Sequence, residues 1–186
     1  CPVPEPNACA MMKTKRFESR VALVTGAAAG IGKATAERLA AEGARLVIAD
    51  YNYPEAERLA EQLNREGAPA FALRFDASET ESCREIVART IERYGTIDIL
   101  VNNVGGSDLS RDLDLLNMDL GYFDEVFHLN LRSVMATTQA ALSEMTLRNR
   151  GSIVNTASIG GLLGDFRGTL YGAAKAGVIG LSLIHI

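Results

Sequence analysis

The sequence has few of the residues that build metal centres and disulfide frameworks. Its 186 residues include no tryptophan, two histidines and three cysteines. The histidines, His128 and His185, lie far apart, and the cysteines, Cys1, Cys9 and Cys83, are odd in number and show no paired spacing. We therefore expect no metal site and no disulfide, as is usual for a protein of the reducing cytoplasm.

The chain also lacks a strong charge and a long apolar run. Its formal net charge is −4, from 19 lysines and arginines against 23 aspartates and glutamates, and the absence of a basic stripe argues against a nucleic-acid partner. No apolar run approaches the roughly 18 residues of a membrane-spanning helix. The apolar fraction of 47% is ordinary for a globular protein, and the length suits one domain with a sizeable core.

Glycine, by contrast, is plentiful, and three glycines cluster after the first apolar run. The stretch Thr25–Gly32 follows residues 21–24 and opens into a helical pattern, which predicts a strand, a tight turn and a helix. The free N–H groups at a helix N-terminus favour an anion such as a pyrophosphate. The spacing of Gly26, Gly30 and Gly32 matches neither the common dinucleotide fingerprint nor the P-loop, so a turn without a ligand is an alternative for this stretch alone.

Strands and helices alternate along the rest of the chain. Apolar runs and helical periodicity predict strands over 21–24, 44–50, 70–75, 97–101 and 151–156, and helices over 33–42, 54–66, 79–94, 119–148 and 171–180. This alternation predicts an α/β fold, with a doubly wound parallel sheet covered by helices on both faces in three layers. In such sheets, ligands bind beyond the carboxyl ends of the strands.

An acidic residue stands at the end of the second predicted strand. Asp50 follows the glycine turn by about 20 residues, where a carboxylate can accept hydrogen bonds from the adenosine ribose hydroxyls of a dinucleotide. The same charge would repel a 2′-phosphate, and Ala29 offers no compensating cation within the turn. The sequence therefore favours NAD over NADP, with a solvated strand-end aspartate as the plain alternative.

Further polar residues follow the third and fourth predicted strands. Asp76 and Ala77 come after the third strand, where Asp76 either hydrogen-bonds adenine or forms a turn. Asn102 and Asn103 come after the fourth, where an asparagine faces the cofactor, links strands or satisfies backbone groups of the turn. We count Asp76, Ala77 and Asn103 among the candidate cofactor contacts.

Three residues after the fifth predicted strand form a candidate acid/base group. Ser158 follows that strand, and Tyr171 and Lys175 are four residues apart on one helical face. A phenol has an ordinary pKa of about 10, and a neighbouring ammonium stabilises the phenolate and lowers that pKa. Acid/base catalysis is most efficient when the pKa lies near the working pH. A tyrosine and lysine at this spacing are common by chance, so the prediction depends on their combination with the serine and the glycine turn.

In these motifs the chain resembles the short-chain dehydrogenase/reductase family, in its standard-length branch. The stretch Thr25–Gly32 is similar to that family's Thr-Gly-x-x-x-Gly-x-Gly turn, and Asn102–Gly105 is similar to its Asn-Asn-Ala-Gly segment. Asn130, Ser158, Tyr171 and Lys175 match the asparagine, serine, tyrosine and lysine of the family's active site. The resemblance spans nearly all of residues 20–180 and implies a Rossmann fold.

The resemblance implies hydride transfer between C4 of the nicotinamide of NAD and an alcohol or carbonyl carbon. It makes Tyr171 the general acid/base. It implies that Lys175 binds the nicotinamide ribose and lowers the pKa of Tyr171. Ser158 would orient the substrate oxygen, and Asn130 would support a water that links Lys175 to solvent. The implied cofactor contacts are Gly26, Gly30, Ile31, Gly32, Asp50, Asp76, Ala77, Asn103, Tyr171 and Lys175.

The sequence departs from the family pattern at one motif residue and at its ends. Val104 replaces the alanine of the Asn-Asn-Ala-Gly segment, which puts a larger side chain beside the cofactor. We expect residues 1–19 to be a disordered or non-native tail, residues 20–180 an incomplete dinucleotide-binding domain, and residues 181–186 non-native. Because the family's last strands are absent, we expect this chain by itself to be prone to aggregation and inactive.

Three functions are compatible with these features. The first is an NAD(H)-dependent oxidoreductase that acts on a small-molecule alcohol or carbonyl and forms a dimer or tetramer through the long helix before Asn149 and the helix after Tyr171. The second is an NAD-binding redox sensor or regulator without turnover, which would not need the acid/base pair. The third is an inert fragment of the parent enzyme. Sugars, polyols, steroids and acyl-carrier substrates all remain open.

Overall fold

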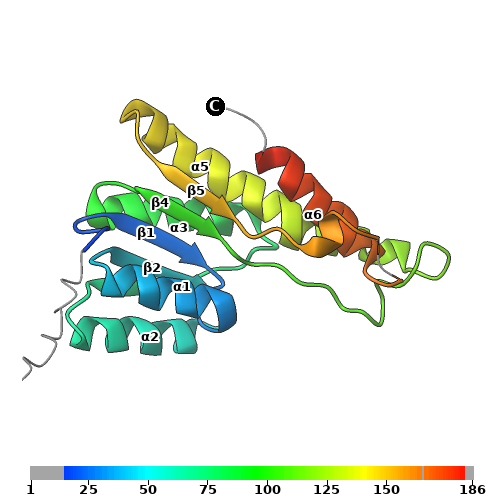
Figure 1. The fold of residues 1–186 in the computed structure, drawn as a ribbon, viewed down its shortest axis with the longest axis horizontal. Coiled ribbons are helices and arrows are strands. Elements are labelled where there is room, and N and C mark those ends of the chain that lie inside the picture. The colour runs from blue at the N-terminus through cyan, green and yellow to red at the C-terminus, as the bar shows by residue number, and fades with distance from the viewer. Residues whose placement is uncertain (1–14, 165, 183–186) are drawn as a thin grey trace, which may run out of the picture.

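A parallel five-stranded sheet forms the centre of the computed structural model, which describes residues 15–164 and 166–182 (Figure 1). The expectations for residues 1–14 and 183–186 lie outside these residues. The strands are β1 (Val21–Thr25), β2 (Arg45–Asp50), β3 (Ala70–Arg74), β4 (Ile99–Asn102) and β5 (Ser152–Asn155). They run in the order β3-β2-β1-β4-β5, and every pairing is parallel. The predicted doubly wound sheet is confirmed.

Helices cover both faces of this sheet. The α-helices are α1 (Gly30–Ala41), α2 (Tyr53–Arg65), α3 (Thr80–Tyr94), α4 (Phe123–Phe127), α5 (Ser133–Leu147) and α6 (Thr169–Ser182). One apolar core joins α1 and α2 to the sheet, and a second joins α3 and α5 to its other face (Figure 1). The apolar residues of β1 alternate between the two cores, Ala22 and Val24 in the first and Leu23 in the second. None of the described helices is both long and apolar enough to cross a bilayer.

The predicted long helix over 119–148 is several shorter segments. Asp119 caps a 3₁₀ turn, η1 (Leu120–Tyr122), by accepting a hydrogen bond from the backbone N–H of Gly121. A π-helical turn, η2 (His128–Arg132), separates α4 from α5. Within it, Nδ2 of Asn130 donates to the carbonyl oxygen of Val126 at 2.9 Å. In a regular α-helix this carbonyl accepts from the backbone N–H of Asn130 instead. The helical pattern was correctly predicted, but the interruption at Asn130 was not.

The residues next to the two predicted domain boundaries pack as follows. Residues 15–19, predicted as part of a tail, lie against the domain, because Phe17 packs on the first core and its N–H donates to the carbonyl of Glu42. Arg16 adds an ion pair with Glu42, whose side chain is buried. At the other end α6 continues two residues beyond 180, to Ser182. The packed domain therefore begins before residue 20.

The cysteine of the described residues belongs to the core. Cys83, on α3, is fully buried in the second core. Burial raises the pKa of its thiol to about 11, so the side chain stays uncharged at neutral pH. It therefore acts as a small apolar residue.

A buried asparagine ties β4 to β5 and α5. Asn102 is 3% exposed, and its Nδ2 donates to Oδ1 of Asn155 at 2.9 Å and to Oγ1 of Thr138 at 3.1 Å. Its Oδ1 accepts from Oγ1 of Thr137 at 2.7 Å. Of the three roles considered for this side chain, the structure shows the one that links strands.

We expect Asn102→Ala to lower the free energy of unfolding by about 1–3 kcal/mol, because it leaves buried polar partners unpaired. Chemical denaturation of both proteins measures the difference. Asn52→Ala is the matched control, since Asn52 is exposed and its side chain makes no cap hydrogen bond. Equal stability of the two variants would contradict the role given to Asn102.

Candidate active site

The glycine turn between β1 and α1 depends on all three of its glycines. Gly26 and Gly30 have φ angles of 62° and 54°, in the left-handed region that favours glycine. A Cβ on Gly32 would overlap the carbonyl oxygen of Gly26. Ala29 is the N-cap residue of α1 and offers no side-chain hydrogen bond to the helix N-terminus. The first N–H groups of α1 therefore lack a side-chain cap, which is the arrangement that suits an anionic ligand.

Asp50 lies against this turn. One oxygen of its carboxylate accepts from the N–H of Ala28 at 2.9 Å, and the other accepts from the N–H of Asn52 at 2.9 Å. The carboxylate is half-buried at the end of β2, next to the glycine turn. Ile31, in the first turn of α1, is 70% exposed. The structure thus brings Asp50 and the turn together, as the sequence predicts.

Asp76 takes the turn-forming arrangement. Its Oδ1 accepts from the N–H of Ser78 at 2.9 Å and from Oγ of Ser78 at 2.6 Å. Ala77 is buried in the second core. Both residues lie just beyond β3, whose neighbour in the sheet is β2, so they share an edge with Asp50. Their contact with an adenine stays a prediction.

Asn103 faces the glycine turn. Its N–H donates to Oγ1 of Thr25 at 3.0 Å, and its Nδ2 donates to the carbonyl oxygen of Gly26 at 3.2 Å. The neighbouring Asn102 points to β5 and α5 instead, because successive side chains of a strand alternate between faces. Asn103 therefore holds the turn from the β4 side.

The segment after β5 brings Ser158 next to Tyr171. Oγ of Ser158 accepts from the N–H of Gly160 at 3.2 Å, which starts a 3₁₀ turn, η3 (Ile159–Gly161). A Cβ built on Gly160 would lie 3.5 Å from Oγ of Ser158 and 3.9 Å from the ring of Tyr171. Both side chains line one cavity of about 720 Å³. The predicted pairing of serine and tyrosine is therefore present in space.

Lys175 is buried beneath Tyr171. It is 2% exposed, and its Nζ lies 5.7 Å from the centroid of the Tyr171 ring and donates to the carbonyl oxygen of Thr156 at 2.8 Å. Burial lowers the pKa of the Lys175 ammonium from its ordinary value, since the charged form loses hydration. The carbonyl of Thr156 offsets part of this loss, and sequence reasoning did not identify that residue.

Asn130 meets the segment after β4 in a closed set of hydrogen bonds. Its Oδ1 accepts from the N–H of Gly106 at 2.9 Å, and its Nδ2 donates to the carbonyl of Gly106 at 2.8 Å. The side chain is fully buried. A Cβ on Gly105 would lie 2.7 Å from both Oδ1 of Asn130 and Nζ of Lys175. Gly105 therefore lies directly between Asn130 and Lys175. The motif Asn102–Gly105 includes this glycine, but the sequence alone does not show why the position needs a residue without a Cβ.

Comparison with known families gives a consistent result. Residues 20–184 match the short chain dehydrogenase family. A 7α-hydroxysteroid dehydrogenase of Bacteroides fragilis is 47% identical over 167 residues, which are 90% of this chain and 64% of that protein. A 3-oxoacyl-[acyl-carrier-protein] reductase of Thermotoga maritima is 37% identical over 169 residues, 90% of this chain and 67% of that protein. The chain thus spans about two thirds of the length of these relatives.

Solved structures of similar proteins share the fold. A 7α-hydroxysteroid dehydrogenase complexed with NADH and 7-oxo glycochenodeoxycholic acid has a TM-score of 0.83 at 30% identity, with 91% of this chain and 65% of that chain covered. A short chain dehydrogenase from Mycobacterium smegmatis has a TM-score of 0.81 at 36% identity, with 89% and 69% covered. The sheet and helices described above are therefore those of a known enzyme fold.

We expect Gly105→Ala to weaken NADH binding about tenfold, because a 1–3 kcal/mol packing conflict with Asn130 and Lys175 displaces both side chains. Fluorescence titration with NADH measures the change. Gly106→Ala is the matched control, since a Cβ on Gly106 meets nothing within 4 Å. If both variants bind NADH like the unmodified protein, the contact point at Gly105 is unimportant for the site.

Proposed function

Because the chain belongs to the short-chain dehydrogenase family, we propose that it transfers a hydride between NAD(H) and an alcohol or carbonyl substrate, with Tyr171 as general acid/base. One observation carries this proposal. The buried Nζ of Lys175 lies 5.7 Å from the Tyr171 ring centroid, and Ser158 shares a cavity with Tyr171. A binding protein without turnover would have no use for this arrangement, which argues against the redox-sensing alternative.

The residues around the glycine turn fit a dinucleotide. Gly26, Gly30 and Gly32 have no Cβ at the closest points of the turn, and the N-terminus of α1 has no side-chain cap, which suits a pyrophosphate. Asp50 and Asn103 hold the turn from β2 and β4. When bound, NADH supplies the hydride that adds to the substrate carbonyl carbon.

Each candidate catalytic residue then has one task. In carbonyl reduction, Tyr171 gives its phenolic proton to the substrate oxygen as the hydride reaches the carbon, and in alcohol oxidation it takes the proton back. Ser158 donates a hydrogen bond to the same oxygen. The ammonium of Lys175 stabilises the phenolate left on Tyr171, at a place where little water competes for it. Asn130 holds the segment at Gly106 that packs beside Lys175.

A hydroxysteroid or its ketone is the substrate class we propose. This rests on the 47% identity with a 7α-hydroxysteroid dehydrogenase, against 37% with the acyl-carrier reductase. The cavity beside Tyr171 supports it, because apolar side chains that suit a steroid skeleton line this space: Leu109, Ile159, Leu162 and Leu163.

We further propose that the protein works in the cytoplasm as a homo-oligomer. A groove over α4, η2 and α5 has a mainly apolar lining that includes Phe123, Phe127, Leu131 and Met135. Phe123 and Met135 are 41% and 50% exposed, so a second copy of the chain could cover them.

Asp50 should make NAD preferred over NADP. We expect Asp50→Asn combined with Ala29→Arg to shift the ratio of NAD to NADP affinity by about tenfold or more, since one charged hydrogen bond contributes about 1.5–3 kcal/mol. The amide oxygen of the asparagine can still accept from the N–H of Ala28 in the glycine turn, and the bond that is lost is the one from the N–H of Asn52, outside that turn. Asp50→Asn with Ala29→Gln lacks the cation and is the control. Preference of the unmodified protein for NADP would show that Asp50 has another role.

Tyr171→Phe should lower turnover by about 10²- to 10⁴-fold, the usual contribution of a general acid/base. Loss of NADH absorbance during reduction of 7-oxo glycochenodeoxycholic acid and a panel of other carbonyl compounds measures the rate, and NADH fluorescence measures binding, which should survive. Tyr51→Phe, at an exposed tyrosine, is the control. Unchanged turnover in Tyr171→Phe would reject the mechanism, and NADH binding with no turnover on any compound would favour the redox sensor.

A further inference from the structure

Asp112 is a buried carboxylate that none of the predicted motifs includes. It is 0% exposed, although it lies in the polar segment between β4 and η1. Its Oδ1 accepts from the N–H of Leu170 at 2.8 Å, and its Oδ2 accepts from the N–H of Tyr171 at 2.9 Å and from Oγ of Ser107 at 2.7 Å. Two of the three donors are backbone N–H groups, which cannot move without moving the chain at Leu170 and Tyr171.

These bonds make Asp112 the cap of α6. The first N–H groups of a helix have no partner within the helix and are usually satisfied by the residue just before it. Here the acceptor for Leu170 and Tyr171 comes from 58 and 59 residues earlier in the chain. A carboxylate at this end is also favoured by the helix dipole. A further bond fixes the start of α6, because the side-chain Oγ1 of Thr169 donates to the backbone carbonyl of Leu113 at 2.8 Å.

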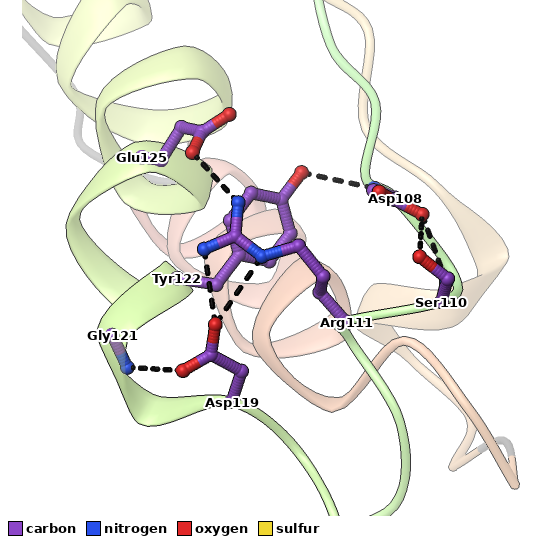
Figure 2. Close-up of polar contacts among 7 residues, drawn as sticks. All are labelled: Asp108, Ser110, Arg111, Asp119, Gly121, Tyr122 and Glu125. Atoms are coloured by element: carbon purple, nitrogen blue, oxygen red, sulfur yellow. Dashed lines mark hydrogen bonds and ion pairs between the residues drawn. The ribbon is translucent and has the colours of Figure 1, made fainter.

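The segment that carries Asp112 is itself fixed to η1 and α4, as Figure 2 shows. The guanidinium of Arg111 lies 4.0 Å from the centroid of the Tyr122 ring and pairs with Asp119 at 3.0 Å and with Glu125 at 3.2 Å. The hydroxyl of Tyr122 accepts from the N–H of Asp108 at 2.9 Å (Figure 2). Exposed ion pairs contribute little to stability by themselves. Here Arg111 also packs on the buried ring of Tyr122, which limits the movement of its guanidinium.

The same segment forms a wall of the candidate active site. Leu109 lines the cavity that Ser158 and Tyr171 also line. Asp112 therefore contacts the backbone of Tyr171 on one side and, through Ser107, holds the start of the segment that contains Leu109 on the other. One carboxylate sets the position of the acid/base and of the apolar wall together.

We propose that Asp112 is a positioning residue that sets the place of Tyr171 relative to Ser158 and the substrate wall. It is not a proton donor or acceptor in the reaction, because it is fully buried and its two oxygens already accept three hydrogen bonds. It acts through the backbone of Tyr171. This inference rests on the proposed function, in which Tyr171 is the general acid/base.

The test replaces Asp112 by its near-isosteric amide. In Asp112→Asn the amide nitrogen faces an N–H, so either Leu170 or Tyr171 loses its acceptor. We expect kcat for the reduction to fall about 10- to 100-fold, since small displacements of a catalytic group have effects of that size. NADH affinity should change much less than kcat, because the glycine turn, Asp50 and Asn103 are untouched. Thr169→Val removes only the bond from the Thr169 hydroxyl to the carbonyl of Leu113 and leaves the backbone bond, so it should give a smaller fall. This variant serves if Asp112→Asn does not fold.

Asp114→Asn is the matched control. Asp114 lies two residues further on, is exposed, and caps Leu116 and Asn117 within its own turn, with no bond to α6. Its replacement should leave kcat unchanged. Hydrogen exchange at the amides of Leu170 and Tyr171 needs no substrate, and it should speed up in Asp112→Asn but not in Asp114→Asn.

A double-mutant cycle separates positioning from general stability. If Asp112 acts through Tyr171, then Asp112→Asn has little further effect on the residual rate of Tyr171→Phe. Equal losses in both backgrounds, or unchanged exchange at Leu170 and Tyr171, would overturn the inference. Failure of the proposed function looks different, because Tyr171→Phe would then retain full turnover or no carbonyl compound would be reduced. In that case the exchange measurement still decides whether Asp112 holds the start of α6.

Discussion

The parallel pairing of β1 with β2 on one side and β4 on the other determines where the glycine turn, Asp50 and Asn103 lie. Because all five strands run the same way, the glycine turn, Asp50 and Asn103 leave the sheet at one edge. Leu23 is paired with Val47 and with Leu100, and all three are fully buried. A shift in this register would move each strand end by a residue and reverse its side chains. The register of β1 therefore also positions the strand ends that carry this part of the site.

Local patterns in the sequence predict the frame of this site well. The glycine turn, Asp50 and the pair Tyr171 and Lys175 are each recognisable within a short stretch, since strand, turn and helix signals are local. Asp112 is different, because its partners on α6 are 58 and 59 residues away and an aspartate in a polar segment looks like a solvated one. The π-helical turn at Asn130 also escapes prediction, because it depends on where Gly106 lies.

The side chains in the interior of the site are closely packed. Gly105 separates Asn130 from Lys175 at distances where a single methyl group would not fit. The adjacent residues Asn102 and Asn103 make separate contacts: Asn102 bonds to β5 in the core, and Asn103 bonds to the glycine turn. Polar side chains that are fully hydrogen-bonded in a buried setting have one arrangement only. The same bonds that stabilise the fold therefore also hold the candidate catalytic residues in place.

The distance along the chain between the two halves of the site has a consequence for synthesis. The ribosome releases β1, β2 and β3 before α6 exists, and domains begin to assemble from the N-terminus as they emerge. The turn at Gly26 and the carboxylate of Asp50 can thus adopt their places early. Tyr171 reaches its place only after the contacts with Asp112 close a span of 59 residues. A growing chain would complete the half around the glycine turn first and the half around Tyr171 last.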